Sequence, residues 1–549
     1  MATTPDDLSP MDAQPHTTFR DTGMILALIA LGAILRISGF TTLSLWFDDA
    51  WSAMPAKASL GEAVHMVVTT PLYTLGMREW ILLGPHATWW AQIPAFVLGL
   101  AGIPALWMLG TMFGLPRRIT LLMATVIAVS PITMTYSLRV KEYSADLLLA
   151  CVLLALAERW RRNHSTRTLV ALVATACLSI AISASTAVVI AAVVIMLVWT
   201  AHSERNVRRQ LLLGLGIFVI VSGIVWAIWL RHVPRILFHN WREHGFLLDF
   251  RGFHPILFST TTSGAGILHG LLGLPVAWNP SKAVYPLITV TTALIGWTLV
   301  CASLVVALRG SAPRKGQQMG AMFVPAAAVL LNIILWAIDK VPFGSGRTDE
   351  VLYPALLLLL GNLAVVTWKK ITSLSRIAVQ GPTSLMLASV IALGLVAIGA
   401  SHRPTYPGID FSKLKKELFA NLKPGQYVVV DGFVSFPWAY AGVSPTSISF
   451  TNSGIPWPQN FHVMSNDPRI VMSQSYLTPD DQILTLSKRT HHIWFVNATN
   501  EAYSNAVPTQ WRNLSIISQT LNAMTPLGWE PYSFPIAATG IYAQAYGYR

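Results

Sequence analysis

The amino-acid sequence predicts an α-helical polytopic membrane protein with about eleven transmembrane helices and a C-terminal extracytoplasmic α/β domain. Two observations predict this class. The 549 residues are 53% hydrophobic and only 11% charged, with a mean hydropathy of +0.52, which is far more apolar than a typical soluble domain. After residue 400 the run of membrane-length apolar segments ends and strand-like segments begin.

Residues 1–21 are predicted to form a cytoplasmic tail, and residues 22–400 a transmembrane domain. An apolar segment of about 20 residues is long enough to cross a bilayer as a helix. By this criterion the predicted spans lie near residues 22–40, 87–113, 119–137, 144–160, 168–183, 186–200, 211–230, 284–308, 319–341, 351–368 and 383–400.

Basic residues cluster in alternate connections between these spans, at 117–118, 159–167, 205–209, 309–315 and 369–376. Membrane proteins keep such clusters on the cytoplasmic side. The loop 41–86, the turn 138–143, the segment 231–283 and the turn 342–350 are therefore predicted to face outward. This placement accounts for the net charge of +13 without a nucleic-acid partner.

The segment 231–283 contains scattered histidines and aromatic residues, which favour an amphipathic platform on the membrane surface. Within it, residues 260–264 (TTTSG) could line a sugar site or form a loop. The three cysteines, Cys151, Cys177 and Cys301, all lie in apolar segments, with no disulfide framework or zinc-ligand spacing.

Residues 401–549 are predicted to form the extracytoplasmic domain, after a proline-containing linker. The pattern predicts a helix over 410–422, strands at 427–430, 493–496 and 541–544, and a further helix around 509–524. Alternation of strands and helices is typical of an α/β domain.

Adjacent carboxylates, Asp48 and Asp49, follow the first apolar span in a stretch almost free of Lys and Arg. A carboxylate pair at a membrane edge is costly to desolvate and so indicates a task. One of the two could act as general base for an acceptor hydroxyl, with the other as its support. The structural alternative is an Asp that caps the N-terminus of a helix.

The turn at 137–143 carries Arg139 and Lys141 on the predicted outer face, against the orienting bias. A phosphate ligand would hold them there, because Arg offers a bidentate fork and Lys a point charge. Alternatively, both cations pair with Glu142 and Asp146, which lie at helical spacings.

The stretch GSGRTDE at 344–350 is a third outward candidate. Two glycines allow backbone amides to converge on an anion, and Arg347 adds a positive charge. Glycine also simply ends helices, so this alternative stays open.

These segments, in order, resemble the GT-C superfamily of membrane glycosyltransferases, in particular the bacterial branch similar to protein O-mannosyltransferases (glycosyltransferase family 39-like). This sequence has Asp49 where that branch more usually has Glu, and Gln92 where the branch commonly has an Arg. The likeness covers roughly residues 22–400 and is carried by LWFDDAW at 45–51, TPLYTL at 70–75, PRR at 116–118, SP at 130–131, YS at 136–137, RVKEY at 139–143, GR at 346–347 and YP at 353–354.

The resemblance implies an enzyme that moves a sugar from a polyprenyl-phosphate donor to an envelope glycan, lipid or protein at the outer face of the membrane. It implies Asp48 as catalytic base, with Asp49 at the second acidic position. The donor phosphate would contact Arg139, Lys141 and Arg347, which would stabilise the leaving group. The substrate cavity would include Glu142, Tyr143 and Tyr353.

No cofactor is required by this interpretation, although a divalent metal at Asp48 and Asp49 could take part. Two other functions remain open. A transporter or flippase for a lipid-linked substrate commonly shows paired half-repeats and broken helices near mid-membrane, whereas this sequence concentrates its polar residues in external turns. A non-catalytic envelope scaffold predicts no cluster of cations opposite Asp48.

Overall fold

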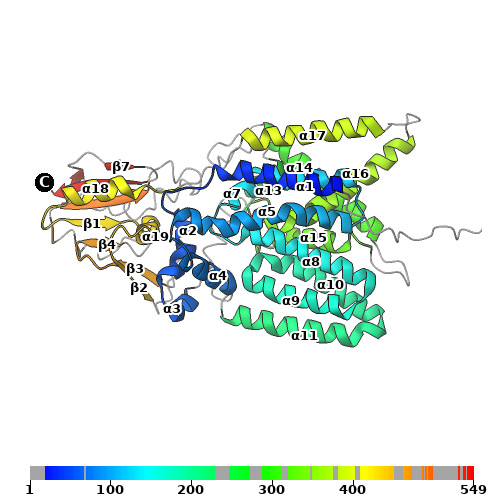
Figure 1. The fold of residues 1–549 in the computed structure, drawn as a ribbon, viewed down its shortest axis with the longest axis horizontal. Helices are drawn as coiled ribbons and strands as arrows, with labels where there is room; N and C mark the ends of the chain where they lie inside the picture. Colours follow the sequence, from blue (N-terminus) through cyan, green and yellow to red (C-terminus); the bar gives the residue numbers. More distant parts are fainter. Residues whose placement is uncertain are drawn as a thin grey trace, which may run out of the picture.

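The computed structural model describes residues 19–66, 70–228, 246–272, 287–311, 320–345, 349–374, 381–401, 408–450, 461–472, 485–486, 489–490, 492–498, 529–531, 536–538 and 541–548. Figure 1 shows two parts: long helices that run roughly parallel, and a β-sheet part that lies against one end of them. We call this end of the helical part the sheet end and the opposite end the far end.

The helical part follows the apolar pattern of the sequence closely. Its long helices are α1 (Phe19–Ile37), α5 (Thr88–Met112), α6 (Arg117–Val129), α8 (Tyr143–Asn163), α9 (Thr166–Ile182), α10 (Ala187–Ser203), α11 (Arg205–Ile228), α13 (Phe253–Leu272), α14 (Leu287–Ser311), α15 (Phe323–Ala337), α16 (Tyr353–Leu374) and α17 (Gly381–Ser401). Shorter helices at the sheet end are α2 (Phe47–Ala53), α3 (Leu60–His65), α4 (Pro71–Leu82) and α7 (Pro131–Tyr136), with 3₁₀ turns η1 (Met54–Lys57), η2 (Ala184–Thr186) and η4 (Glu350–Leu352).

The outer surface of these helices is apolar, as expected of helices that face lipid. On α11, the side chains of Leu213, Val219 and Ile220 are more than 60% exposed, which would be unfavourable in water. Within the described ranges, five helices are long and apolar enough to cross a membrane, and three shorter ones are also apolar. The predicted total of about eleven spans and their orientation stay predictions.

The predicted span 119–137 is divided into two helices at its sheet end. α6 ends at Val129 and α7 begins at Pro131. Because proline has no N–H, Pro131 cannot donate to the carbonyl of Ile127, so the α-helical bonding pattern stops here.

The sequence pattern did not predict α13, which lies within the segment 231–283. Small and hydroxyl-bearing residues lower its hydropathy, yet its central part is buried. Residues 260–264 therefore lie in a helix and not in a loop. α13 packs closely on α14, since a Cβ on Gly296 would lie 2.2 Å from the carbonyl oxygen of Gly264, and such small residues allow two helix backbones to approach. Residues 229–245 and 273–286 lie outside the described residues.

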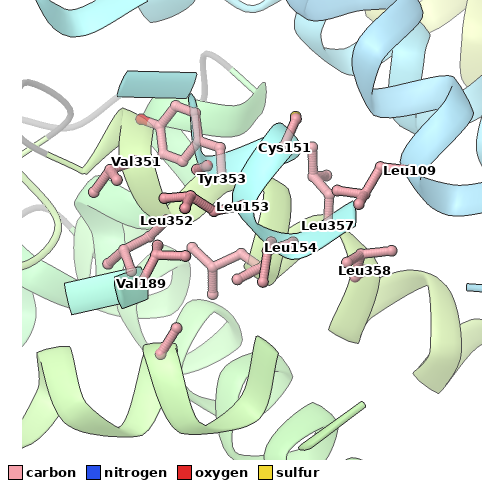
Figure 2. Packing of buried hydrophobic residues seen from close by; sticks show 14 of the residues in the cluster. Leu109, Cys151, Leu153, Leu154, Val189, Val351, Leu352, Tyr353, Leu357 and Leu358 are labelled. Atoms are coloured by element: carbon pink, nitrogen blue, oxygen red, sulfur yellow. The ribbon is translucent and has the colours of Figure 1, made fainter. Parts of the chain in front are cut away.

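Buried apolar side chains from distant segments form the core of the helical part. Figure 2 shows Leu153 and Leu154 of α8 beside Val189 of α10 and Leu357 of α16. Tyr353, at the first residue of α16, lies at the edge of the same cluster. The start of α16 is therefore anchored by packing near the sheet end.

The sheet part contains a mixed six-stranded sheet among its described residues, in the order β4-β1-β5-β8-β6 with β7 paired to β8. β1 is parallel to β4 and β5, whereas β8 is antiparallel to its neighbours, and β2 and β3 form a separate hairpin. The strands are β1 (Tyr427–Val430), β2 (Thr446–Phe450), β3 (Phe461–Ser465), β4 (Ile470–Met472), β5 (His492–Ala498), β6 (Trp529–Pro531), β7 (Ile536–Ala538) and β8 (Ile541–Tyr548).

The predicted strands at 427–430, 493–496 and 541–544 are confirmed as β1 and as parts of β5 and β8. The helix predicted over 410–422 is α18 (Phe411–Asn421), and α19 (Gly432–Tyr440) follows β1. The helix predicted around 509–524 lies outside the described residues.

The sheet part contacts the helical part through the connection between α1 and α2. The backbones of Ser44 and Ile409 form a reciprocal antiparallel bridge, with N···O distances of 2.9 and 3.1 Å. The ring centroids of Phe47 in α2 and Phe436 in α19 are 5.6 Å apart. One hydrophobic cluster includes both sides of this contact, so α2 is held by the sheet part on one face.

Candidate active site

The carboxylates of Asp48 and Asp49 lie in the first turn of α2. Negative charge is favourable there, because the first amides of a helix carry a partial positive charge. The N-cap residue is Trp46, whose side chain makes no capping bond. The alternative in which an Asp serves as the N-cap is therefore wrong for both residues.

Asp49 is fully buried and both of its oxygens are engaged. Nε of Arg139 donates to Oδ2 at 2.6 Å, and the backbone N–H of Val140 donates to Oδ1 at 2.8 Å. Charge-assisted bonds of this kind are short and directional. Asp49 therefore joins α2 to the turn at 137–143.

Asp48 has a different environment from its neighbour. Adjacent helical residues point about 100° apart, and Asp48 is only half-buried where Asp49 is fully buried. Of the two predicted catalytic carboxylates, Asp48 is thus the more exposed.

The turn at 137–143 brings both of its predicted phosphate-binding cations to α2. Besides the ion pair of Arg139 with Asp49, Nζ of Lys141 lies 5.1 Å from the ring centroid of Trp51, a cation–π distance. Lys141 is 5% exposed. These partners come from a segment about 90 residues away, which neither sequence interpretation of the turn had considered.

Gln92 connects the same turn to the chain leaving α1. Its Nε2 donates to the carbonyl of Leu138 at 2.9 Å and to that of Gly39 at 3.4 Å, while its Oε1 accepts from the N–H of Thr41 at 3.2 Å. Gln92, which stands where the resembled family commonly has Arg, is thus fully buried. Its side chain bonds to the backbone of the turn and of the chain leaving α1.

Arg36 lies beneath the turn and is fully buried. Its Nε donates to Oγ of Ser137 at 2.9 Å, its Nη1 to the carbonyl of Ala128 at 2.7 Å, and its Nη2 to the carbonyl of Ile127 at 3.0 Å. The sequence interpretation missed this residue. The available signal was an ionisable residue inside an apolar span, which commonly marks a functional region.

The predicted cavity residues Glu142, Tyr143 and Tyr353 lie near this turn with different exposures. Glu142 is half-buried at the N-cap of α8, and Tyr143 is buried with its ring centroid 4.9 Å from that of Tyr136. Tyr353 is 1% exposed, within electrostatic range of Tyr136 and Glu350.

Tyr73, from the TPLYTL stretch, joins this group from α4. Burial, followed by the negative charges of Glu142 and Asp49, raises the pKa of Tyr73 well above its ordinary value. Tyr73 therefore stays a neutral hydroxyl at physiological pH. It is a hydrogen-bonding group beside the acidic residues and not a further negative charge.

Two further buried carboxylates lie deeper at the sheet end. Asp146 of α8 and Glu350 of η4 are within electrostatic range of each other, and Arg36 lies near Glu350. The acidic residues of α8 and η4 and the cation of α1 thus meet in one region, although their segments are far apart in sequence.

Arg347, the third predicted phosphate ligand, lies outside the described residues. Gly344, which precedes it, has a φ of +73°, and a Cβ there would lie 2.1 Å from the carbonyl oxygen of Ser263 in α13. A glycine is required at this position by packing and by backbone conformation; it does not end a helix, because α15 already ends at Ala337.

Both oxygens of Asp49, which the sequence offers as a possible metal ligand together with Asp48, accept a hydrogen bond, one from Arg139 and one from the amide of Val140. Within the described ranges, no group of three or more His, Cys, Asp or Glu residues is arranged to hold a metal ion.

Solved structures similar to this chain include an oligosaccharyltransferase and ArnT. An oligosaccharyltransferase from Archaeoglobus fulgidus, in complex with Zn and sulfate, is 12% identical, with a TM-score of 0.46 and coverage of 95% of this chain and 72% of its own. ArnT from Cupriavidus metallidurans is 13% identical in the apo state, with a TM-score of 0.40 and coverage of 96% and 98%. Bound to undecaprenyl phosphate, it is 14% identical, with a TM-score of 0.39 and coverage of 95% and 98%.

Both neighbours are glycosyltransferases of the GT-C type. In sequence, no family model and no curated protein matches this chain. Identities and TM-scores this low assign no role to any residue here.

Proposed function

We propose that this protein is an integral-membrane glycosyltransferase that moves a sugar from a polyprenyl-phosphate donor to an extracytoplasmic cell-envelope acceptor. Asp48 acts as the general base. One observation carries the proposal: a carboxylate accessible to substrate lies beside a fully engaged carboxylate, Asp49, whose partner Arg139 comes from a cationic turn at the end of apolar helices.

In the proposed reaction, Asp48 removes the proton of an acceptor hydroxyl as its oxygen attacks the anomeric carbon. The bond between that carbon and the phosphate oxygen breaks, and polyprenyl phosphate leaves with the electron pair. The developing negative charge is stabilised by the cations of the turn, Arg139 and Lys141, and in this proposal also by Arg347. No metal takes part in this sequence of steps.

The division of labour between the two carboxylates follows from their contacts. Asp49 gives both oxygens to Arg139 and Val140, so it orients the turn and holds the guanidinium. Asp48 is half-buried, and we assign it the role of proton acceptor from the acceptor hydroxyl.

The direct test is transfer by the purified protein from a panel of polyprenyl-phosphate sugars, followed as labelled glycoside product. Asp48→Asn should lower turnover by about 10²- to 10⁴-fold, the usual contribution of a general base, with unchanged thermal unfolding. Asp467→Asn, in the sheet part and away from the site, is the matched control and should retain activity. Arg347→Ala should weaken donor use more than acceptor use.

Turnover by Asp48→Asn equal to wild type would remove Asp48 as base. Movement of a labelled polyprenyl-phosphate sugar across vesicles without product formation would favour a flippase, and neither activity would favour a scaffold. Equal loss toward donor and acceptor in Arg347→Ala would make that residue a brace of its loop.

The proposed orientation, with the N-terminus cytoplasmic, is tested separately by cysteine labelling in intact cells. Gly61 in α3 and Gly310 at the far end of α14 both have open space where a side chain would begin. A membrane-impermeant maleimide should label Gly61→Cys but not Gly310→Cys. The reverse pattern would place α2 in the cytosol and would remove an extracytoplasmic acceptor.

A further inference from the structure

The guanidinium of Arg36, although it lies in the apolar helix α1, makes several buried hydrogen bonds. Besides Ser137, Ala128 and Ile127, its Nη1 donates to the carbonyl of Gly32 at 3.0 Å and its Nη2 contacts Oγ1 of Thr133 at 3.4 Å. A charge in a membrane helix is costly and is retained where it performs a task. The contacts of Arg36 indicate what that task is.

The break between α6 and α7 leaves the carbonyl of Ile127 without its usual helical N–H donor, and Arg36 donates to it. In a continuous helix the carbonyl of Ile127 would accept from the N–H of residue 131, but Pro131 has none. The hydroxyl of Thr133 donates to this carbonyl at 2.8 Å, and the guanidinium adds a second donor to it and donates also to the carbonyl of Ala128. A positive charge at the C-terminal end of a helix is also electrostatically favourable.

The same guanidinium reaches the turn that holds Asp49. Its Nε donates to Ser137, whose Oγ in turn donates to the carbonyl of Met134 at 2.8 Å. Two residues later, Arg139 and Val140 donate to Asp49. A shift of Ser137 would therefore move both donors of Asp49 relative to α2.

We propose that Arg36 is a positioning residue: it holds the α6–α7 break and the turn at 137–140 in register with α2, and thereby sets the place of Asp48 and of the cations that meet the donor phosphate. The effect of Arg36 on substrate binding rests on the proposed function, whereas its effect on the position of the turn does not. Lysine cannot replace it, because a single ammonium lacks the fork that reaches a side chain and two carbonyls in fixed directions.

The structural arm of the test is amide hydrogen exchange of residues 137–141 in the full-length protein. Arg36→Lys keeps the charge, and Ser137→Ala removes the acceptor of Nε together with the hydroxyl's bond to Met134. Both should accelerate exchange in this turn, by about tenfold or more in Arg36→Lys, while exchange in β1 and β5 is unchanged. Arg208→Lys, an exposed arginine of α11, is the matched control.

The functional arm uses undecaprenyl phosphate as the probe. Arg36→Lys should weaken its binding by about 10- to 100-fold, the scale expected when binding groups are displaced by a fraction of an ångström or more. If Arg36 acts through Arg139, the double variant Arg36→Lys/Arg139→Lys should bind about as weakly as Arg139→Lys alone, because effects within one network are not additive.

Exchange at 137–141 that equals wild type in both variants would overturn the proposal, and so would acceleration spread evenly over the whole chain. Fully additive losses in the double variant would also overturn it. Failure of the wild type to bind undecaprenyl phosphate would count against the proposed function alone, because the exchange arm still decides the role of Arg36.

Discussion

Arginines at the two ends of the helical part have contrasting environments. At the sheet end, Arg36 is fully buried and the side chain of Arg139 is 15% exposed, and each bonds to a segment about 90 or more residues away. At the far end, the side chains of Arg117 and Arg162 are 48% and 50% exposed. The same residue type therefore builds a site at one end and lies at a solvated surface at the other.

The contrast has an electrostatic reason. A buried charge must be paired and hydrogen-bonded, since its desolvation costs several kcal/mol. An exposed charge is stabilised by water and contributes about 0–1 kcal/mol through a surface ion pair. The far-end arginines suit the orienting role predicted for basic clusters, whereas the buried ones constrain tertiary structure.

Breaking the ion pair of Asp49 and Arg139 should give the greatest loss of stability. Arg139→Met leaves the buried carboxylate of Asp49 without its cation, and should destabilise the protein by about 3–5 kcal/mol. Thermal unfolding in detergent measures the loss, and transfer activity should fall with it. A midpoint unchanged from wild type would contradict a structural role for the pair.

The contact between α2 and the sheet part should give the next greatest effect. Phe436 is 1% exposed and packs against Phe47, so Phe436→Ala should cost about 3 kcal/mol through lost burial and a cavity. Phe253→Ala is the matched control, because Phe253 is 75% exposed. Equal unfolding midpoints for the two variants would show that α2 does not depend on α19.

Tyr440 makes the same contact sensitive to high pH. Burial raises the pKa of Tyr440 to about 12. Because the folded pKa is higher than the unfolded one, its contribution is complete below pH 10 and is lost as the pH rises through 12. The total is about 2–3 kcal/mol for a two-unit shift.

Unfolding midpoints from pH 9 to pH 12 should therefore fall more steeply for wild type than for Tyr440→Phe, which has no titrating hydroxyl. Lys57, whose Nζ lies 5.5 Å from the ring centroid of Tyr440, is present in both proteins and so cancels in the comparison. Parallel pH profiles would mean that Tyr440 does not ionise against its buried setting.

The least change is expected at the far end. Arg117→Met removes the ion pair with Asp21, whose side chain is 9% exposed, and should destabilise the protein less than Arg139→Met does, because the half-exposed guanidinium leaves this pair partly solvated; the same unfolding assay measures the loss. A loss as large as that of Arg139→Met would erase the contrast between the two ends.

Much of the architecture was predictable from local sequence. Continuous apolar segments require membrane helices, because a buried backbone must satisfy its hydrogen bonds within the segment. Short β-branched runs likewise predicted β1 and β5. α13 was not predictable in this way, since its burial depends on close packing of small residues against α14 rather than on hydropathy.

The candidate site shows the same division between what local sequence predicts and what the tertiary structure decides. Local sequence was enough to identify two adjacent carboxylates and a cationic turn, whereas Arg36 in the first apolar span was missed. The folded arrangement was needed to establish which carboxylate is enclosed by Arg139 and Val140, which one stays accessible, and that Arg36 holds the turn beneath them. The reason is that these contacts join segments about 90 to 100 residues apart, and no local pattern encodes the distance between two such segments in space.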